Sequence, residues 1–146
     1  MEKFLNPRSV VIVGAPRRTG PGSFNNVETM LRYGYGGRIY PVNPQAGEIC
    51  GLRAFESIAH VPERADLAVV SVGRDRVFPA LEACARAGIG RIIVVTQGFS
   101  DADDHGRALQ ERMTAFAREK GIRILGPNTM GVVNNFASFT TSFVDL

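Results

Sequence analysis

The chain has 146 residues, a formal net charge of +3 at pH 7, 45% hydrophobic residues and 21% charged residues. This length fits one domain with a sizeable buried core, and the ordinary apolar content excludes a largely disordered chain. The arginines are scattered, and no helix-turn-helix, zinc-finger or aromatic RNA-binding motif accompanies them, which argues against nucleic-acid binding.

The sequence also indicates a compartment. No apolar run approaches the ~20 residues that span a bilayer, and the first residues, Met1 to Pro7, lack the hydrophobic core of a signal peptide. Cys50 and Cys84 lie far apart and have no metal-ligand spacing, so we expect two unpaired thiols in a reducing environment. We therefore expect a cytoplasmic protein without a membrane partner.

The stretch Ser9 to Asn26 combines a buried strand, a glycine-rich loop and the start of a helix, with Ser23 as the expected N-cap. Backbone N–H groups converge at such a helix start, and the helix dipole favours negative charge. Two loop arginines add full positive charge. The stretch therefore predicts an anion site, usually for a phosphate. Its candidate residues are Gly14, Ala15, Pro16, Arg17, Arg18, Gly22 and Ser23.

Strands and helices alternate along the rest of the chain. Further strands are expected at Arg38 to Val42, Leu67 to Val72, Arg91 to Thr96 and Ile122 to Leu125. Helices are expected to begin near Asp75 and within Ser100 to Asp104. This alternation predicts an α/β fold, a Rossmann-like doubly wound five-stranded parallel sheet with helices on both faces.

The expected strand order, numbered along the chain, is 3-2-1-4-5. Ligands of such sheets bind beyond the carboxyl ends of the strands, at the point where the order reverses. In this order the reversal lies between the first and fourth strands. The loops Gly14 to Gly22 and Thr96 to Phe99 are therefore expected to face each other across the site.

A nicotinamide dinucleotide is the first ligand to consider, and the sequence argues against NAD. The loop glycines at 14, 20 and 22 are spaced more widely than in G-x-G-x-x-G, and Tyr40 to Pro44 contains no acidic residue to hold a ribose diol. NADP tolerates the missing acid, because an arginine can bind its 2′-phosphate. An NADP-binding domain therefore remains an alternative, although no tyrosine–lysine pair for hydride transfer supports it.

Six blocks of the sequence, taken together, resemble one family. They are Phe4 to Ser9, Val11 to Pro16, Ile39 to Pro44, Asp66 to Val69, Thr96 to Phe99, and Leu125 to Asn128 with Gly131. In this order they are similar to the N-terminal CoA-binding domain of NDP-forming acyl-CoA synthetases. That family includes the ADP-forming acetyl-CoA synthetases and is related to the succinyl-CoA synthetase alpha subunit. The resemblance implies a CoA-binding domain in residues 1–135, and a tail, residues 136–146, that leads to a second domain.

The resemblance implies coenzyme A as the ligand, and the 3′-phosphate and diphosphate of CoA fit the two loop arginines. Solvated loop arginines remain the alternative. Small polar groups after the fourth strand suit the pantetheine amides, and Asn128 is expected to shape the site. The candidate contacts after the later strands are Pro41, Asn43 and Pro44; Ser71, Val72 and Gly73; Thr96, Gln97 and Gly98; and Asn128.

Two positions depart from the family pattern. The family often has Val-Pro-Ala where this chain continues with Gly73 and Arg74 after Val72, which leaves the details of that wall open. A cysteine commonly follows the family's Gly-Pro-Asn motif, and Thr129 stands there in this chain, so no thiol contributes at this position.

No catalytic or metal site can be assembled from the sequence. His60 and His105 are expected at the surface, and helix capping explains the aspartates at 101, 103 and 104. In the family, the phosphorylated histidine lies in a flavodoxin-like domain and an ATP-grasp module supplies the nucleotide, so ATP or ADP is expected only outside this chain.

Two functions follow. In the first, the chain is the CoA-binding part of an acyl-CoA ligase and is inactive when isolated. In the second, it is a stand-alone, non-catalytic and regulatory CoA-binding module. Surface for neighbouring domains, subunits or an oligomer is expected at Phe136, Phe139 and Phe143.

Overall fold

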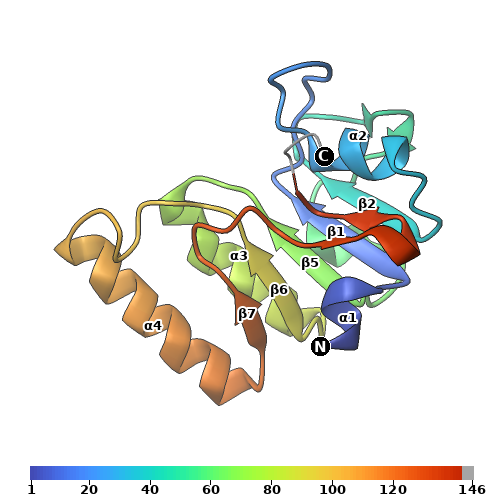
Figure 1. The fold of residues 1–146 in the computed structure, drawn as a ribbon. Coiled ribbons are helices and arrows are strands. Elements are labelled where there is room, and N and C mark those ends of the chain that lie inside the picture. The colour runs from blue at the N-terminus through green and yellow to red at the C-terminus, as the bar shows by residue number, and fades with distance from the viewer. Residues whose placement is uncertain (143–146) are drawn as a thin grey trace.

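The computed structural model describes residues 1–142 and confirms the α/β class (Figure 1). Five parallel strands form the main sheet: β1 (Ser9–Val13), β2 (Arg38–Val42), β5 (Leu67–Val70), β6 (Arg91–Val94) and β7 (Arg123–Leu125). The helices are α1 (Glu2–Leu5), α2 (Asn26–Arg32), α3 (Arg74–Arg86) and α4 (Asp104–Lys120). Among the residues described, no helix combines the length and apolarity that crossing a membrane requires.

Two short antiparallel ribbons and two 3₁₀ turns complete the fold. The ribbons pair β3 (Glu48–Ile49) with β4 (Leu52–Arg53), and β8 (Val133–Asn134) with β9 (Phe139–Thr140). The 3₁₀ turns are Ile58–His60 and Asn135–Ala137.

Helices cover both faces of the sheet, as predicted (Figure 1). On one face, α3 and α4 pack on alternate strand residues such as Val11 and Ile92. On the other face, α1, α2 and the C-terminal segment pack on residues such as Val10 and Ile93. All residues of β5 are fully buried, because this strand lies in the middle of the sheet with both faces covered.

The strand order differs from the predicted one. The sheet runs β2-β1-β5-β6-β7, so the third strand along the chain, β5, pairs with β1 and not with β2. Pro41 gives the physical reason, because a residue without an N–H suits an edge strand and β2 lies at the edge. On the outer side of β2, the N–H of Phe55 donates to the Pro41 carbonyl at 2.8 Å. The order therefore reverses between β1 and β5.

The helix starts agree only partly with the sequence. The N-cap of α2 is Asn25 rather than Ser23, and Phe24 lies before the helix with a φ of 50°. The N-cap of α3 is Gly73, which places Asp75 within the first turn. In α4, Asp103 is the N-cap and its carboxylate accepts the Gly106 N–H at 2.6 Å, as helix capping predicted.

The segment after β7 contains two short strands and a 3₁₀ turn. It crosses the α2 face of the sheet and folds back as the β8–β9 ribbon (Figure 1). Phe139 is fully buried with its ring centroid 5.0 Å from that of Tyr35, so its predicted exposure was wrong. Phe136 is fully exposed, as predicted. Phe143 lies outside the described residues.

Candidate functional site

The predicted site residues lie in and around the loops at the carboxyl ends of the strands. All five strands are parallel, so the loops that follow them meet at the carboxyl-end edge. The longest of these, residues 14–25, is the blue loop at the top of Figure 1. Because β1 lies between β2 and β5, the direct neighbours of this loop are the loop after β2 and Ser71–Gly73, and the loop after β6 lies one strand further away.

A hollow of about 470 Å³ opens beyond the ends of β5, β6 and β7. Five of the predicted residues line it: Ser71, Val72, Thr96, Gln97 and Asn128. Its other lining residues, which the sequence did not indicate, are Phe24, Val95, Thr129 and Met130. We call this cavity the carboxyl-end hollow. Of the β1 loop, only Phe24 reaches it, so the hollow and the two arginines occupy different parts of the same edge.

Asn25 organises the loop after β1. Its side chain is 2% exposed, and its Oδ1 accepts the N–H groups of Val27 and Glu28 at 3.0 and 3.3 Å. Its Nδ2 donates to the carbonyl oxygens of Pro16 and Arg18, each at 3.0 Å. One amide thus caps α2 and fixes the path of the loop. Its place directly before a helical apolar pattern was the available signal for this role.

Glu28 also holds the loop after β1 in place. Its carboxylate accepts the N–H of Gly20 at 2.9 Å and the hydroxyl of Ser23 at 3.3 Å. Together with Asn25, it occupies the N–H groups of Gly20, Val27 and Glu28, so these three donors are engaged within the protein. Arg17 and Arg18 are both exposed and carry the positive charge of the loop.

Gly14 and Gly22 have different environments. At Gly14, with a φ of 81°, a Cβ would collide with the Ser71 carbonyl and the Val72 side chain, so this glycine lets the loops after β1 and β5 pack together. At Gly22, with a φ of 76°, a Cβ would meet no atom within 4 Å, so its positive φ rather than close packing favours glycine there. The N–H groups of Gly14 and Ala15 already donate to the Val42 carbonyl.

Asn43 connects the loop after β2 to the loop after β1. Its Nδ2 donates to the Ala15 carbonyl at 2.9 Å, and its Oδ1 accepts the Gln45 N–H at 2.8 Å. Both side-chain polar atoms are thus engaged within the protein, and Asn43 holds the loop in place. Pro44 is exposed beside it, whereas Pro41 is buried within β2.

Thr96 and Arg74 connect the loops after β5 and β6. The Thr96 hydroxyl donates to the Val72 carbonyl at 2.7 Å, which leaves its oxygen able to accept a hydrogen bond from a ligand. Arg74 donates through Nη1 to the Gly98 carbonyl at 2.8 Å and to Asp103 at 2.9 Å. A backbone N–H and Arg74 hold the pKa of Asp103 below its ordinary value. Arg74, a departure from the family pattern, thus ties the two loops together.

Asn128 stands where the chain leaves β7. It has a φ of 53°, which asparagine tolerates better than most residues, and its N–H donates to the Thr96 carbonyl at 2.9 Å. Its Nδ2 donates to Asp101 at 3.3 Å, and its Oδ1 is chemically able to accept a hydrogen bond. Gly126 before it is packed against the Val94 carbonyl.

The groups with general chemical reactivity lie elsewhere. His60 and His105 are exposed, as predicted, and neither lines the carboxyl-end hollow. Cys50 and Cys84 are free thiols, the first half-buried and the second buried. Within residues 1–142, no group of three His, Cys, Asp or Glu side chains is placed to hold a metal ion.

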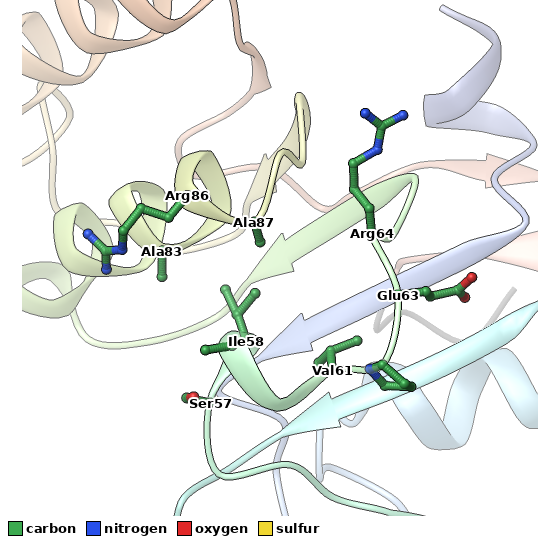
Figure 2. A pocket seen from close by; sticks show the side chains of 10 residues that line it. Ser57, Ile58, Val61, Glu63, Arg64, Ala83, Arg86 and Ala87 are labelled. Atoms are coloured by element: carbon green, nitrogen blue, oxygen red, sulfur yellow. The ribbon is translucent and has the colours of Figure 1, made fainter.

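A larger hollow of about 600 Å³ lies on the α3 face, between residues 57–64 and the last turns of α3 (Figure 2). Figure 2 shows Ile58, Ala83 and Ala87 around it, whereas the side chains of Arg64 and Arg86 point away from each other. The strand ends contribute no residue to this hollow. Its arginines do not converge on one point, so its charges are not arranged to bind a phosphate.

Comparison with known proteins identifies the family of this chain. A family model described as a CoA binding domain matches residues 8–135. An ADP-forming acetate–CoA ligase II of Archaeoglobus fulgidus is 39% identical over 143 residues, which are 98% of this chain and 21% of the relative. The alpha subunit of the ADP-forming acetate–CoA ligase I of Pyrococcus furiosus is 33% identical, over 98% of this chain and 32% of the subunit.

A solved structure agrees with this assignment. The dinucleotide-forming acetyl-coenzyme A synthetase 1 of Ca. Korarchaeum cryptofilum, in complex with phosphate and ADP, superimposes with a TM-score of 0.88 at 33% identity. The match covers 97% of this chain and 30% of that protein, so the chain spans between a fifth and a third of these relatives. The chain belongs to the CoA-binding domain family and matches the N-terminal part of NDP-forming acyl-CoA synthetases.

Proposed function

We propose that the chain presents coenzyme A as the acyl acceptor of an NDP-forming acyl-CoA synthetase, with CoA lying along the carboxyl-end edge of the sheet. One observation carries this proposal. Two exposed arginines stand at the β1 end of this edge, and an uncharged hollow stands at its β5–β7 end. Coenzyme A has the same polarity along its length, with phosphates at one end and a thiol at the other.

The spacing of the strands sets the distance that the ligand has to cross from β1 to β7. Neighbouring strands lie about 4.8 Å apart, so three strand spacings from β1 to β7 amount to about 14 Å. Arg17 and Arg18 would bind phosphate groups through charge-assisted hydrogen bonds. The pantetheine arm would then cross β5 and β6, where the Thr96 oxygen accepts and the Gln97 amide both donates and accepts.

The remaining chemistry is proposed to lie outside this chain. The relatives are three to five times longer, and a phosphorylated histidine domain and an ATP-grasp module would supply the activated acyl group. Neither histidine of this chain lines the carboxyl-end hollow. We expect the isolated chain to bind CoA and to form no acyl-CoA. A reading frame that stops after Leu146, with no ligase genes nearby, would favour the stand-alone regulatory module instead.

Calorimetric titration of the purified chain tests the ligand. CoA should bind more tightly than dephospho-CoA, because the 3′-phosphate adds charge that the arginines can meet, and more tightly than NADPH. Tighter binding of NADPH than of CoA would overturn the proposal in favour of an NADP-binding domain.

Charge reversal of both loop arginines tests the phosphate end. The double variant R17E/R18E should weaken CoA binding by about 1.5–3 kcal/mol for each hydrogen bond lost to a charged group. The matched control is R86E/R123E, which changes the net charge equally at exposed arginines away from the carboxyl ends of the strands. Equal effects of the two double variants would mean that Arg17 and Arg18 act only through net charge.

A further inference from the structure

We propose that the carboxyl-end hollow is also the seat of the acyl group, and that it selects an uncharged acyl group of the size of an aromatic ring. This inference rests on the proposed function, since it concerns the acyl end of the same ligand. It proposes which class of acyl group this domain selects, and it gives Phe24 and Met130 a part in that selection. The sequence motifs did not indicate either residue.

The position of the hollow suits the acyl end. Asn128, Thr129 and Met130 follow β7, the strand farthest from the β1 loop among those that contribute to this edge. A ligand whose phosphates lie at Arg17 and Arg18 reaches these residues last. The thiol, and any acyl group attached to it, would therefore lie between the ends of β6 and β7.

The lining of the hollow indicates the polarity of the acyl group. Among the described residues, no Asp, Glu, Lys, Arg or His side chain lines it. Two of its polar donors are already engaged, the Thr96 hydroxyl with the Val72 carbonyl and the Asn128 amide with Asp101. A second carboxylate on the acyl group would lose its hydration there without gaining a cationic partner, which is costly. The lining therefore disfavours dicarboxylic acyl groups.

Two exposed apolar side chains in the hollow favour an aromatic acyl group. Phe24 is 63% exposed and Met130 is 55% exposed, and both line the same hollow. Phe24 has a φ of 50°, an uncommon conformation for a bulky residue, which keeps it out of the helix that Asn25 caps. An aromatic acyl group would pack on the Phe24 ring and against the Met130 thioether, two favourable partners for an aromatic ring.

The volume of the hollow is large enough for an aromatic acyl group. A cavity of about 150 Å³ is enough for benzene in an apolar protein interior, and this hollow measures about 470 Å³. It therefore has room for a ring together with the end of the pantetheine arm. An acetyl group would leave most of the apolar wall exposed to water.

The test is calorimetric titration of the chain with CoA, acetyl-CoA, succinyl-CoA and benzoyl-CoA. Benzoyl-CoA should bind about tenfold more tightly than acetyl-CoA, the gain that accompanies removal of roughly 60 Å² of apolar surface from water. Succinyl-CoA should bind no more tightly than acetyl-CoA. The variants F24A and M130A should each lower the ratio of benzoyl-CoA to acetyl-CoA affinity toward one.

The controls are F136A and L31A, which shorten exposed apolar side chains that do not line the hollow and should leave the ratio unchanged. Equal affinities for acetyl-CoA and benzoyl-CoA, or succinyl-CoA binding as tightly as benzoyl-CoA, would overturn the inference while CoA binding still supported the proposed function. If CoA itself does not bind, the proposed function fails. Thermal melts of each variant exclude loss of folding as the cause.

Discussion

At the scale of single residues, Asn25 shows how one side chain sets up the site. Four of its hydrogen bonds join the start of α2 to the loop that carries Arg17 and Arg18. Because the side chain is buried, an aliphatic replacement would leave two carbonyl groups and two N–H groups to find other partners. The position of both arginines thus depends on a residue that need not touch the ligand.

The variant N25A should lower the free energy of unfolding by about 1–3 kcal/mol, through loss of the helix cap and of hydrogen bonds to buried backbone groups. Urea denaturation followed by circular dichroism measures this change. The control is N135A, at an exposed asparagine, which should stay within about 0.5 kcal/mol of the parent. A similar small effect of N25A would show that the loop holds its path without this amide.

The two thiols should differ in reactivity. Burial raises the pKa of Cys84 to about 12. The pKa of Cys50 is also raised, mainly by burial and to a smaller extent by the nearby Glu28 carboxylate. In the native chain, a thiol reagent such as DTNB should label the half-buried Cys50 and not Cys84, and the rate should rise with pH as the Cys50 thiolate forms. Two equivalents should react in denaturant. Native labelling of a C50A variant would contradict the burial of Cys84.

At the scale of elements, the sequence predicted the strands better than it predicted their order. A strand was expected at Leu67 to Val72, and the structure forms it as β5 and places it in the centre of the sheet. Pro41 in β2 already argued against an interior position for that strand. The position of β2 at the edge was therefore predictable from this proline, whereas the alternation of strands and helices does not determine the strand order.

The start of α2 could not be fixed from the sequence. Ser23 and Asn25 are both good N-caps, and only the contacts of Asn25 with the loop carbonyls decide between them. The same holds for the carboxyl-end hollow. Its predicted members follow directly from the strand ends, whereas Phe24 and Met130 join it through the path of loops that short-range patterns do not determine.

Arg74 links two elements, so its removal should act at a distance along the chain. In R74A the loop 97–103 should exchange its amide hydrogens faster, because the Gly98 carbonyl and Asp103 lose their shared donor. Hydrogen exchange with mass spectrometry measures this. The matched variant R76A removes an exposed arginine from the same helical turn and should leave the loop unchanged. Equal protection in both variants would contradict a linking role for Arg74.

Asp66 links α1 to the amino end of the sheet and makes stability depend on pH. It binds Lys3 at 2.6 Å and the Arg8 N–H at 3.0 Å, and these contacts lower its pKa. The folded state therefore favours the carboxylate, so this stabilisation is present above the ordinary pKa of about 3.8 and is lost as pH falls through the lowered value.

The variant D66N should flatten the fall in unfolding free energy between neutral pH and about pH 3, measured by urea denaturation at several pH values. The variant E111Q removes an exposed carboxylate from the middle of α4 and serves as the control. If D66N and the parent lose stability in parallel as the pH falls, the Asp66 contacts do not contribute to it.

At the scale of the whole molecule, the two faces of the sheet are covered differently. On one face α3 and α4 pack as regular helices. On the other face, α1, α2 and an irregular C-terminal segment do so, and this segment reaches the carboxyl-end edge through Met130. The fold thus leaves the strand ends accessible along one edge while burying β5 beneath both layers.

The central claim is that CoA lies along this edge, and amide chemical shifts recorded during a CoA titration test it most directly. We predict that CoA shifts the amide resonances of residues 17–25, 71–73, 95–98 and 128–131, in the loops that follow β1, β5, β6 and β7. Shifts confined to residues 57–64 and 83–87, around the larger hollow, would contradict this placement of the ligand.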